Sequence, residues 1–333
     1  MRISDRERRE FGAQVEGYRQ ELHLHCYRLM GSIHDAEDMV QETFLRAWRR
    51  RETLHEIALL RAWLYKIATH VCLDTLKSRP KRSVPRERAM VSTLDEPIGQ
   101  ASEEPIWLEP YPDALLSTNE RNPEEHIVAR ENITMAFLVA LHRLPPRQRA
   151  VLLLRDALDW QADEVATLLN TTTSAVKSAL HRARATLADQ GHSSEDDALW
   201  TQSGVAHLHL DSYVQAWEEA DITTLLRLLT EDATFSMPPI PSWYRGKESI
   251  RTLTSITVFS GEAHSRWRLL PTRANRQPAF GLYSQTDSAG LYSAYGIQLV
   301  THRGCMISDI TTFVDATLFS HFNLPETISS SKA

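Results

Sequence analysis

The sequence predicts a multidomain protein in which two all-α domains precede an α+β domain. Three observations support this fold class. Apolar residues recur at helical spacing from about Tyr18 to Leu76 and again over residues 124–187, with almost no strand signal. Segments rich in Pro, Ser or acidic residues follow each helical stretch and carry no sustained period. Beyond Leu199, helical patterns lead into strand-like runs separated by the turn sequences "RANRQP", "TDSAG" and "THRGC".

These patterns also place the domain boundaries. Within the first helical stretch, breaks are expected near Gly31 and within residues 51–60. The expected segments are, in order, a helical domain at 14–80, an acidic and Pro-rich linker at 81–123, a second helical domain at 124–190, a short linker at 191–199 and the α+β domain at 200–325.

Composition excludes several classes of protein. With 333 residues, of which 42% are hydrophobic, the chain can build the cores of two or three domains. It has no apolar run of about 18 residues, and its charged start, "MRISDRERREFG", is not a signal peptide. We therefore expect a cytoplasmic protein with no membrane segment. Cys26, Cys72 and Cys305 lie far apart in the sequence, which favours buried thiols over disulfides or a metal cluster, and no metal or cofactor is expected.

The charge is distributed in blocks. The net charge of −6 argues against a general nucleic-acid coat, because non-specific affinity comes mainly from cations that neutralise phosphates. Residues 61–88, however, hold eight Lys or Arg against two acids, and residues 92–125 hold nine acids against one Arg. Any DNA contact must therefore come from focused basic patches.

The stretch "HDAEDMVQETFLRAWRRR", residues 34–51, begins with acids and ends with arginines, while Val40, Phe44 and Ala47 recur at helical spacing. Acids at the start and bases at the end of a helix suit its dipole, so this pattern is explained by an ordinary surface helix. Whether the four acids also have a cationic partner is left open by this pattern. They are Asp35, Glu37, Asp38 and Glu42.

Residues 144–187, "LPPRQRAVLLLRDALDWQADEVATLLNTTTSAVKSALHRARATL", have the layout of a helix-turn-helix. A first helix at about 161–169 is followed by Asn170, which tolerates the left-handed conformation of a tight turn, and a second helix starts near Thr173. The residues expected to face the core are Val165, Ala166, Leu169, Ala175, Val176, Ala179, Leu180 and Ala183. The opposite face of the second helix, suited to base edges and phosphates, presents Ser174, Lys177, Ser178, His181 and Arg182, with Arg184 at its flank. A basic solvated helix in an ordinary bundle is the alternative.

The segments "DAEDMVQETFLRAW", "RAWLYKIATHVCLDTL" and "LPPRQRAVLLLRD…VKSALHRAR" together resemble regions 2 and 4 of a sigma-70 family factor of the extracytoplasmic-function group, over about residues 14–188. The last third is similar to the SnoaL-like domain, a cone of the nuclear-transport-factor-two (NTF2) type, on "YVQAWEEADITTLLRLLTEDATFSMPP", "WYRGKESI" and "FVDATLFSHFNLP". The resemblance thus implies a region 2 bundle, a region 4 helix-turn-helix and a SnoaL-like/NTF2-like cone.

The resemblance implies a sigma factor that binds core RNA polymerase, through its β′ clamp and β flap, and directs it to specific −35 and −10 promoter elements. The family pattern D-x-x-Q-E, which binds the basic coiled coil of the clamp, falls on Asp38, Gln41 and Glu42. Their spacing puts Asp38 and Glu42 on one helix face, so these acids would have a cationic partner after all.

Residues 61–79 correspond to the part of the family that melts and captures the −10 element. The residues that this assigns to −10 DNA are Trp63, Tyr65, Lys66, His70, Lys77 and Arg79, with the aromatic rings stacking on unpaired bases and the cations holding the backbone. Trp63 fits a core position equally well. The chain departs from the family at His70, where Asn is usual, and at Gln161, where Ser or Thr often caps the first helix of the motif.

Relatives of the SnoaL fold include cyclases and isomerases, so a pocket must be considered. Acid or base chemistry there needs a carboxylate or imidazole in an apolar cone beside a group that tunes its pKa. The candidate pocket residues are Trp217, Trp243, Tyr244, His264, Asp309 and Asp315. None forms a diagnostic constellation, and we expect no catalytic site; ligand sensing or protein docking is favoured.

Two alternatives stay open. A conventional helix-turn-helix regulator would act without core polymerase, and a SnoaL-type cyclase or isomerase would carry the helical domains as accessories. A small-molecule ligand or an anti-sigma protein is a further partner to consider. The tether "DQGHSSEDD" is short, so we expect the last domain to dock on the helical domains and to modulate promoter opening, with Trp107 and Tyr111 as apolar anchors.

Overall fold

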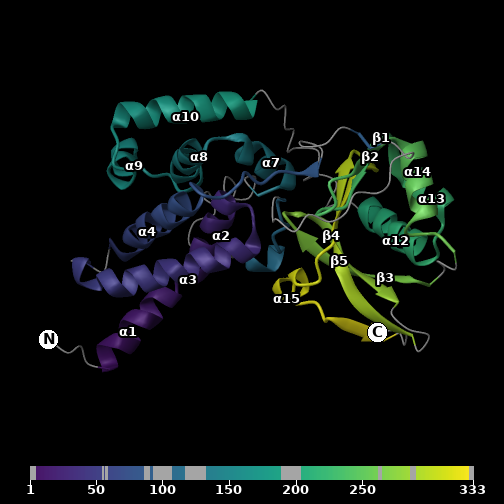
Figure 1. Cartoon of the computed structure of the whole chain (residues 1–333), viewed down its shortest axis with the longest axis horizontal. Helices are drawn as coiled ribbons and strands as arrows, with labels where there is room; N and C mark the ends of the chain where they lie inside the picture. Colours follow the sequence, from purple (N-terminus) through teal and green to yellow (C-terminus); the bar gives the residue numbers. More distant parts are fainter. Residues whose placement is uncertain are drawn as a thin grey trace. The chain divides into compact units, whose positions relative to one another are not determined.

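The computed structural model describes residues 5–54, 56, 59–85, 91–92, 107–116, 133–188, 204–261, 265–285 and 290–329. The chain divides into two compact units that it visits alternately (Figure 1). The helical unit comprises Met1–Arg82 and Leu115–His192, and the sheet unit comprises Ser83–Ala114 and Ser193–Ala333. Part of the expected linker therefore belongs to the sheet unit. No helix in the described parts of the chain is long and apolar enough to cross a membrane.

The helical unit begins with a bundle formed by α1 (Asp5–Glu16), α2 (Arg19–Met30), α3 (Ile33–Arg50), the short turn η1 (Arg51–Thr53) and α4 (Leu60–Thr75). Gly31 ends α2 with a φ of 76°, a conformation that glycine adopts without strain. Ser32 then caps α3, because its side chain accepts a hydrogen bond of 3.1 Å from the Asp35 amide. The helical breaks expected near Gly31 and within residues 51–60 are confirmed.

The second bundle contains α7 (Met135–Arg143), α8 (Pro146–Leu152), the π-helical turn η4 (Leu153–Ala157), α9 (Ala162–Leu168) and α10 (Thr173–Ala188). Asn170 lies between α9 and α10 with a φ of 49°, so the predicted left-handed turn is confirmed. The carboxylate of Glu164 accepts the Gln161 amide at 2.6 Å, which satisfies the start of α9 without a Ser or Thr cap. Val176, Leu180 and Ala183 are buried as predicted, but Ala175 is exposed in the first turn of α10.

The two bundles contact each other inside the helical unit. The ring of Tyr65 on α4 meets that of Trp160, just before α9, edge to face at a centroid separation of 6.1 Å. Arg149 on α8 donates a hydrogen bond to the backbone carbonyl of Leu29 in the last turn of α2. Arg149 is only 2% exposed, so this guanidinium is part of the packed interior.

The sheet unit has three longer helices, α12 (Gly204–Glu218), α13 (Ile222–Leu228) and α14 (Lys247–Ile256), and a short one, α15 (Leu318–His321). Its strands are β1 (Leu229–Ser236), β2 (Trp243–Arg245), β3 (Trp267–Ala274), β4 (Gln277–Gln285), β5 (Leu291–Arg303), β6 (Met306–Phe313) and β7 (Thr327–Ser329). The sheet order is β2-β1-β6-β5-β4-β3, with β7 on β5. β1 pairs with β6 in parallel and the other pairs are antiparallel.

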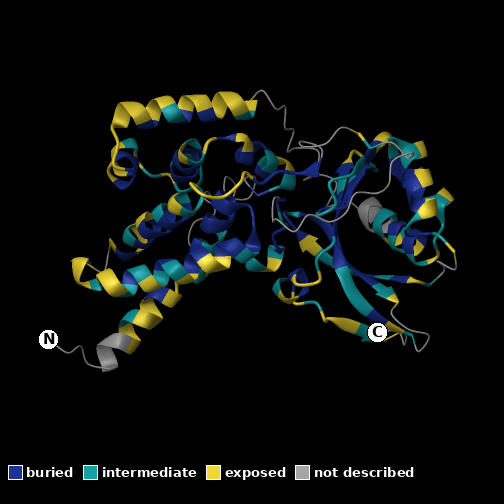
Figure 2. Cartoon of the chain, viewed as in Figure 1, coloured by how far each residue is buried: buried dark blue, intermediate teal, exposed yellow. Residues whose placement is uncertain are grey.

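A core of aromatic and aliphatic side chains joins the sheet to helices α12–α14. Figure 2 shows buried residues along the strands, whereas α10 in the helical unit is mostly exposed. The chain after α15 packs on another part of the sheet, where Gly281 makes room for it: a Cβ at this position would lie 2.6 Å from Leu324 Cδ1. The predicted order of two all-α domains and an α+β domain is confirmed.

Candidate nucleic-acid and protein interfaces

The outer face of α3 is acidic. Asp38 and Gln41 are exposed, and Glu42, one turn after Asp38, is 36% exposed and bonded to Arg46 on the same helix, with 2.7 Å between Glu42 Oε1 and Arg46 Nε. Leu45 follows on this side of the helix and is 52% exposed. The arrangement is a negatively charged helix face with one apolar side chain, which fits a partner with a basic surface.

Asp35 has a different role from the other acids of this helix. It is 7% exposed and forms ion pairs with Arg79 and with Arg82, whose Nη2 lies 2.7 Å from Asp35 Oδ2. Burial opposes ionisation, but the hydrogen bonds and charges of the two arginines outweigh it and hold the pKa of the Asp35 carboxyl below its usual value. Asp35 therefore fastens the segment after α4 to the start of α3.

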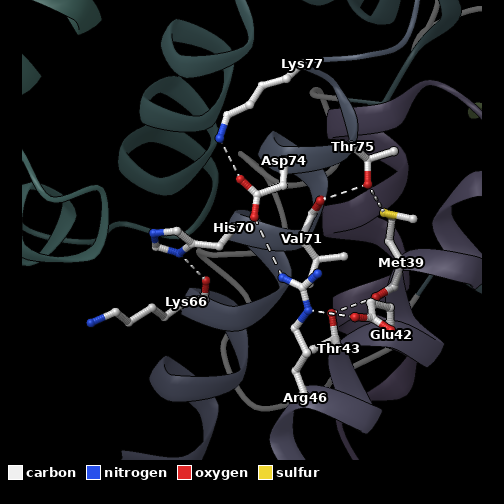
Figure 3. A network of polar contacts seen from close by, with 10 residues as sticks. All are labelled: Met39, Glu42, Thr43, Arg46, Lys66, His70, Val71, Asp74, Thr75 and Lys77. Atoms are coloured by element: carbon white, nitrogen blue, oxygen red, sulfur yellow. Dashed lines mark hydrogen bonds and ion pairs between the residues drawn. The ribbon is translucent and has the colours of Figure 1, made fainter.

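A chain of polar contacts crosses from α3 to the end of α4 (Figure 3). Arg46 lies between Glu42 and Asp74, with Nη1 3.8 Å from Asp74 Oδ2. Asp74 also pairs with Lys77, whose Nζ is 2.7 Å from Oδ1, and this hydrogen bond is the main cause of the lowered pKa of Asp74. The structure thus links a residue of the acidic face to a predicted −10 contact.

The predicted −10 residues other than Tyr65 fall into three groups. Lys66 and Lys77 are exposed, and Trp63 and His70 are half-buried, with His70 Nδ1 2.8 Å from the Lys66 carbonyl oxygen. Arg79 is exposed but paired with Asp35, so its charge also serves the bundle.

The prediction for Tyr65 is wrong. Its side chain is buried, its hydroxyl donates to Glu21 Oε2 at 3.1 Å, and its ring lies edge to face against His25 and Trp160. A ring enclosed in this way cannot stack on an unpaired base. The helical spacing to Ala68 and Cys72, both buried, was the signal that could have placed it in the core.

Helix α10 presents the predicted polar face to solvent (Figure 2). Each of the residues predicted for this face is exposed, namely Ser174, Lys177, Ser178, His181 and Arg182. Arg184 is exposed as well, but it forms a two-pronged ion pair with Asp156 of η4, at 2.6 Å from Nη2 to Oδ1 and 3.0 Å from Nε to Oδ2. Arg184 therefore holds α10 against η4, and the hydrogen bonds that it donates to the Asp156 carboxylate raise the pKa of this arginine.

Residues 107–114, which we call the strap, belong to the sheet unit although they lie between the two helical domains in sequence. Trp107 Nε1 donates to the Pro239 carbonyl at 2.9 Å. Tyr111 exchanges two hydrogen bonds with Asn275 in the β3–β4 turn, from its amide to Oδ1 at 2.8 Å and from the Asn275 amide to its carbonyl at 2.9 Å. Both aromatic residues are buried, so the strap is a packed element of this unit.

Two further residues, Asp113 and Ser92, fix the linker to the same unit. Asp113 accepts the Arg276 amide at 2.8 Å and pairs with Arg273 at 3.2 Å; burial nevertheless raises the pKa of Asp113 above its usual value. Ser92 lies beside the edge strand β2, where its amide donates to the Trp243 carbonyl at 2.9 Å. These contacts join residues more than 140 positions apart in sequence, so no local sequence pattern predicts them.

The residues proposed for a pocket in the cone are divided between the two faces of the sheet. Trp217 and Tyr244 lie in the core, where Trp217 packs against Phe259 and Trp267 at centroid separations of 5.2 and 6.2 Å. Neighbouring residues of a strand point to opposite faces, and Trp243 lies on the other side of β2 from Tyr244. There it lines a shallow cavity of about 290 Å³ with Asp232, Thr234, Arg245, Arg303 and Ser308.

Of the polar candidates, Asp309 lies on the same face of the sheet as Trp243, next to Thr234 of that cavity. Asp309 accepts hydrogen bonds from the hydroxyls of Thr234 and Thr311, on the side of β1 and β6 away from the core. Asp315 follows β6 and accepts from the Thr317 amide at 2.8 Å, and His264 lies outside the described residues. In the described ranges no three His, Cys, Asp or Glu side chains gather as metal ligands.

Two thiols that are far apart in sequence lie together in the first bundle, which no local pattern predicts. Cys26 on α2 and Cys72 on α4 are both fully buried, and burial together with the contact to Cys26 raises the pKa of the Cys72 thiol. Such thiols are poor nucleophiles, so they act as small core residues.

Comparison with known proteins gives consistent matches. Residues 14–82 match the Sigma-70 region 2 family and residues 134–187 match the Sigma-70, region 4 family. The ECF RNA polymerase sigma factor SigG of Mycobacterium tuberculosis is 39% identical over 328 residues, which cover 98% of this chain and 86% of SigG. SigJ of the same species is 31% identical over 67% of this chain and 64% of SigJ. The crystal structure of SigJ superposes with a TM-score of 0.59 at 23% identity, over 95% of this chain and 99% of that chain.

Proposed function

Because the chain belongs to the ECF RNA polymerase sigma factors, which bind core RNA polymerase and promoter DNA, we propose that the surfaces described above divide these tasks among named residues. In this proposal the acidic face of α3 holds the polymerase, the exposed end of α4 captures the −10 element, and α10 reads the −35 element. The observation that carries the proposal is the exposure of Asp38 and Gln41 on α3, with neither side chain bonded to another described residue.

The polymerase contact is assigned to Asp38, Gln41 and Glu42 against the basic coiled coil of the β′ clamp. Exposed acids steer the encounter with a basic surface and fix its register. Leu45 adds an apolar contact at the edge of this face. The β flap is assigned to the region 4 bundle on the family resemblance.

The DNA contacts are assigned to exposed cations and polar groups. On α10, Lys177 and Arg182 are placed to reach base edges or phosphates of the −35 element, with Ser174, Ser178 and His181 beside them. At the −10 element, Trp63, Lys66, His70 and Lys77 remain candidates, whereas Tyr65 is withdrawn.

The SnoaL-like domain is proposed to modulate initiation rather than to catalyse a reaction. The strap supports this role, because residues between the two DNA-reading domains are packed onto that domain through Trp107, Tyr111 and Asp113. Truncation of the domain would also remove every contact of the strap. A single substitution therefore tests the strap contact more specifically than truncation does. Asn275→Ala removes the side-chain acceptor of the Tyr111 amide while keeping the domain; Asn323→Ala, at a turn away from the strap, is the control.

Transcription in vitro with the full chain and core polymerase is expected to differ between Asn275→Ala and wild type, with Asn323→Ala equal to wild type. Equal transcription by all three proteins would show that the strap does not take part in modulating initiation. A small-molecule ligand of this domain, an anti-sigma partner of the protein, a cytoplasmic location and the absence of catalysis remain expectations from the sequence.

The test of the function as a whole compares promoter DNA binding with and without core polymerase. A promoter is first mapped after overexpression, and its duplex is then titrated with the free chain and with the chain bound to core. The free chain is expected to bind poorly, because acidic stretches offset its basic patches. Tight, specific binding without core would instead favour a conventional helix-turn-helix regulator.

A further inference from the structure

Four side chains of alternating charge connect α3 to the end of α4 (Figure 3). Glu42 and Arg46 are one helical turn apart, with Nε of Arg46 2.7 Å from Glu42 Oε1. The same guanidinium extends toward α4, where Nη1 lies 3.8 Å from Asp74 Oδ2. Asp74 in turn holds Lys77 at 2.7 Å. The order of charges is therefore acid, base, acid, base.

The two ends of this chain lie in different proposed surfaces. Glu42 belongs to the face assigned to polymerase, and Lys77 belongs to the residues assigned to −10 DNA. Arg46 belongs to neither surface, yet it contacts the acid of one and the acid that holds the cation of the other. Its side chain is 32% exposed, against 72% for Lys77, so it lies between the two helices rather than in open solvent.

We propose that Arg46 is a positioning residue that couples polymerase binding to the release of Lys77 for a DNA phosphate. The proposal rests on the proposed function of α3. When a polymerase cation takes over the Glu42 carboxylate, Arg46 loses its close partner and moves toward Asp74, where the present 3.8 Å contact is longer than a hydrogen bond. Asp74 then divides its charge between two cations, and Lys77 exchanges Asp74 for phosphate more easily.

The expected effect is modest. Exposed ion pairs are individually weak, and a pair of this kind changes an equilibrium by about two- to five-fold. The direction is distinctive, however: Arg46 competes with polymerase for Glu42 and assists DNA binding through Asp74. Its removal should weaken DNA binding by the holoenzyme without weakening core binding.

The test uses the full chain bound to core polymerase and a fluorescent fork-junction DNA that carries the −10 element of the mapped promoter. Arg46→Gln is expected to lower the DNA affinity about two- to five-fold and to reduce the salt slope by less than about one, because Lys77 contacts the phosphate in a smaller fraction of the complexes. In an Asp74→Asn background Lys77 is already free, so Arg46→Gln should have no further effect. Arg49→Gln, an exposed arginine on the same helix, is the charge-matched control.

An equal loss from Arg46→Gln with and without Asp74→Asn would overturn the proposal, since Arg46 would then act as a direct cation. An equal loss from Arg49→Gln, or no loss at all, would overturn it as well. Glu42→Gln separates this proposal from the one it rests on. If it leaves core affinity unchanged, both fail; if it lowers core affinity while the Arg46 and Asp74 changes are additive, only the coupling by Arg46 fails.

Discussion

Arg149 of α8 donates a hydrogen bond to the backbone carbonyl oxygen of Leu29 in α2, so a buried guanidinium of the region 4 bundle binds the last turn of a helix in the region 2 bundle. The same side chain reaches the carbonyls of His142 and Leu144, each at 3.3 Å. Burial lowers the pKa of Arg149 to about 9, which leaves it charged at neutral pH. A buried cation that donates to three backbone carbonyls is costly to disturb.

Arg149→Met should therefore destabilise both bundles by about 2–3 kcal/mol, because three carbonyls lose a charged donor. Hydrogen exchange of the α2 and α8 amides measures this loss locally. Arg147→Met, an exposed position on the same helix, is expected to stay within about 0.5 kcal/mol of wild type. Equal protection of α2 in both variants would show that the Leu29 contact carries no stability.

Substitutions of Trp63 and Tyr65 should affect different properties, mainly open-complex formation for Trp63 and folding stability for Tyr65. Tyr65→Ala removes a buried aromatic ring and should cost about 3–5 kcal/mol of folding stability, as read from urea unfolding. Trp63→Ala, at a half-buried position, should cost less stability and instead reduce open-complex formation at the mapped promoter. If Trp63→Ala unfolds the domain as Tyr65→Ala does, then Trp63 is a core residue.

On α10, Lys177→Ala and Arg182→Ala should each weaken −35 binding by the holoenzyme. The expected loss is about 1–3 kcal/mol for a base contact, or a salt slope smaller by about one for a phosphate contact. Arg184→Ala should act through the fold, by at most about 1 kcal/mol, since its partner is Asp156. If Arg184→Ala alone changed the salt slope, the DNA-binding face would have to be reassigned to the side of α10 that carries Arg184.

His25 should make the first bundle sensitive to acid. Burial, assisted by the charge of Arg28, lowers the pKa of His25 to about 3, while its Nε2 lies 2.9 Å from Thr69 Oγ1. Below pH 6.5 this histidine binds a proton in the unfolded chain but not in the folded chain. The free energy of unfolding therefore falls by about 1.4 kcal/mol per pH unit as the pH drops toward 3. Urea titrations between pH 6 and 5 give the free energy of unfolding as a function of pH. In His25→Gln this pH dependence should be smaller by the contribution of about one proton. An unchanged slope would mean that His25 takes up its proton in the folded bundle.

Local patterns predicted α3, α9 and α10 well, because the apolar spacing, Asn170 and the placement of charges all act within a few residues. The faces of strands were also readable: Trp243 and Tyr244 are adjacent and cannot point into one pocket. By contrast, the Asp35 ion pairs and the strap contacts join residues far apart in sequence. The linker looked unstructured because the strap has no period of its own and is ordered by Pro239, Asn275 and Arg276.

The affinity of the full chain for core RNA polymerase, compared between wild type and Asp38→Arg, tests the central claim most directly. Reversing an exposed acid that faces a basic surface should lower the affinity at least about tenfold, whereas Glu52→Arg, at a side chain 85% exposed on η1, should not. Circular dichroism should be the same for all three proteins. An unchanged affinity for Asp38→Arg in a folded protein would contradict the assignment of the α3 face to polymerase.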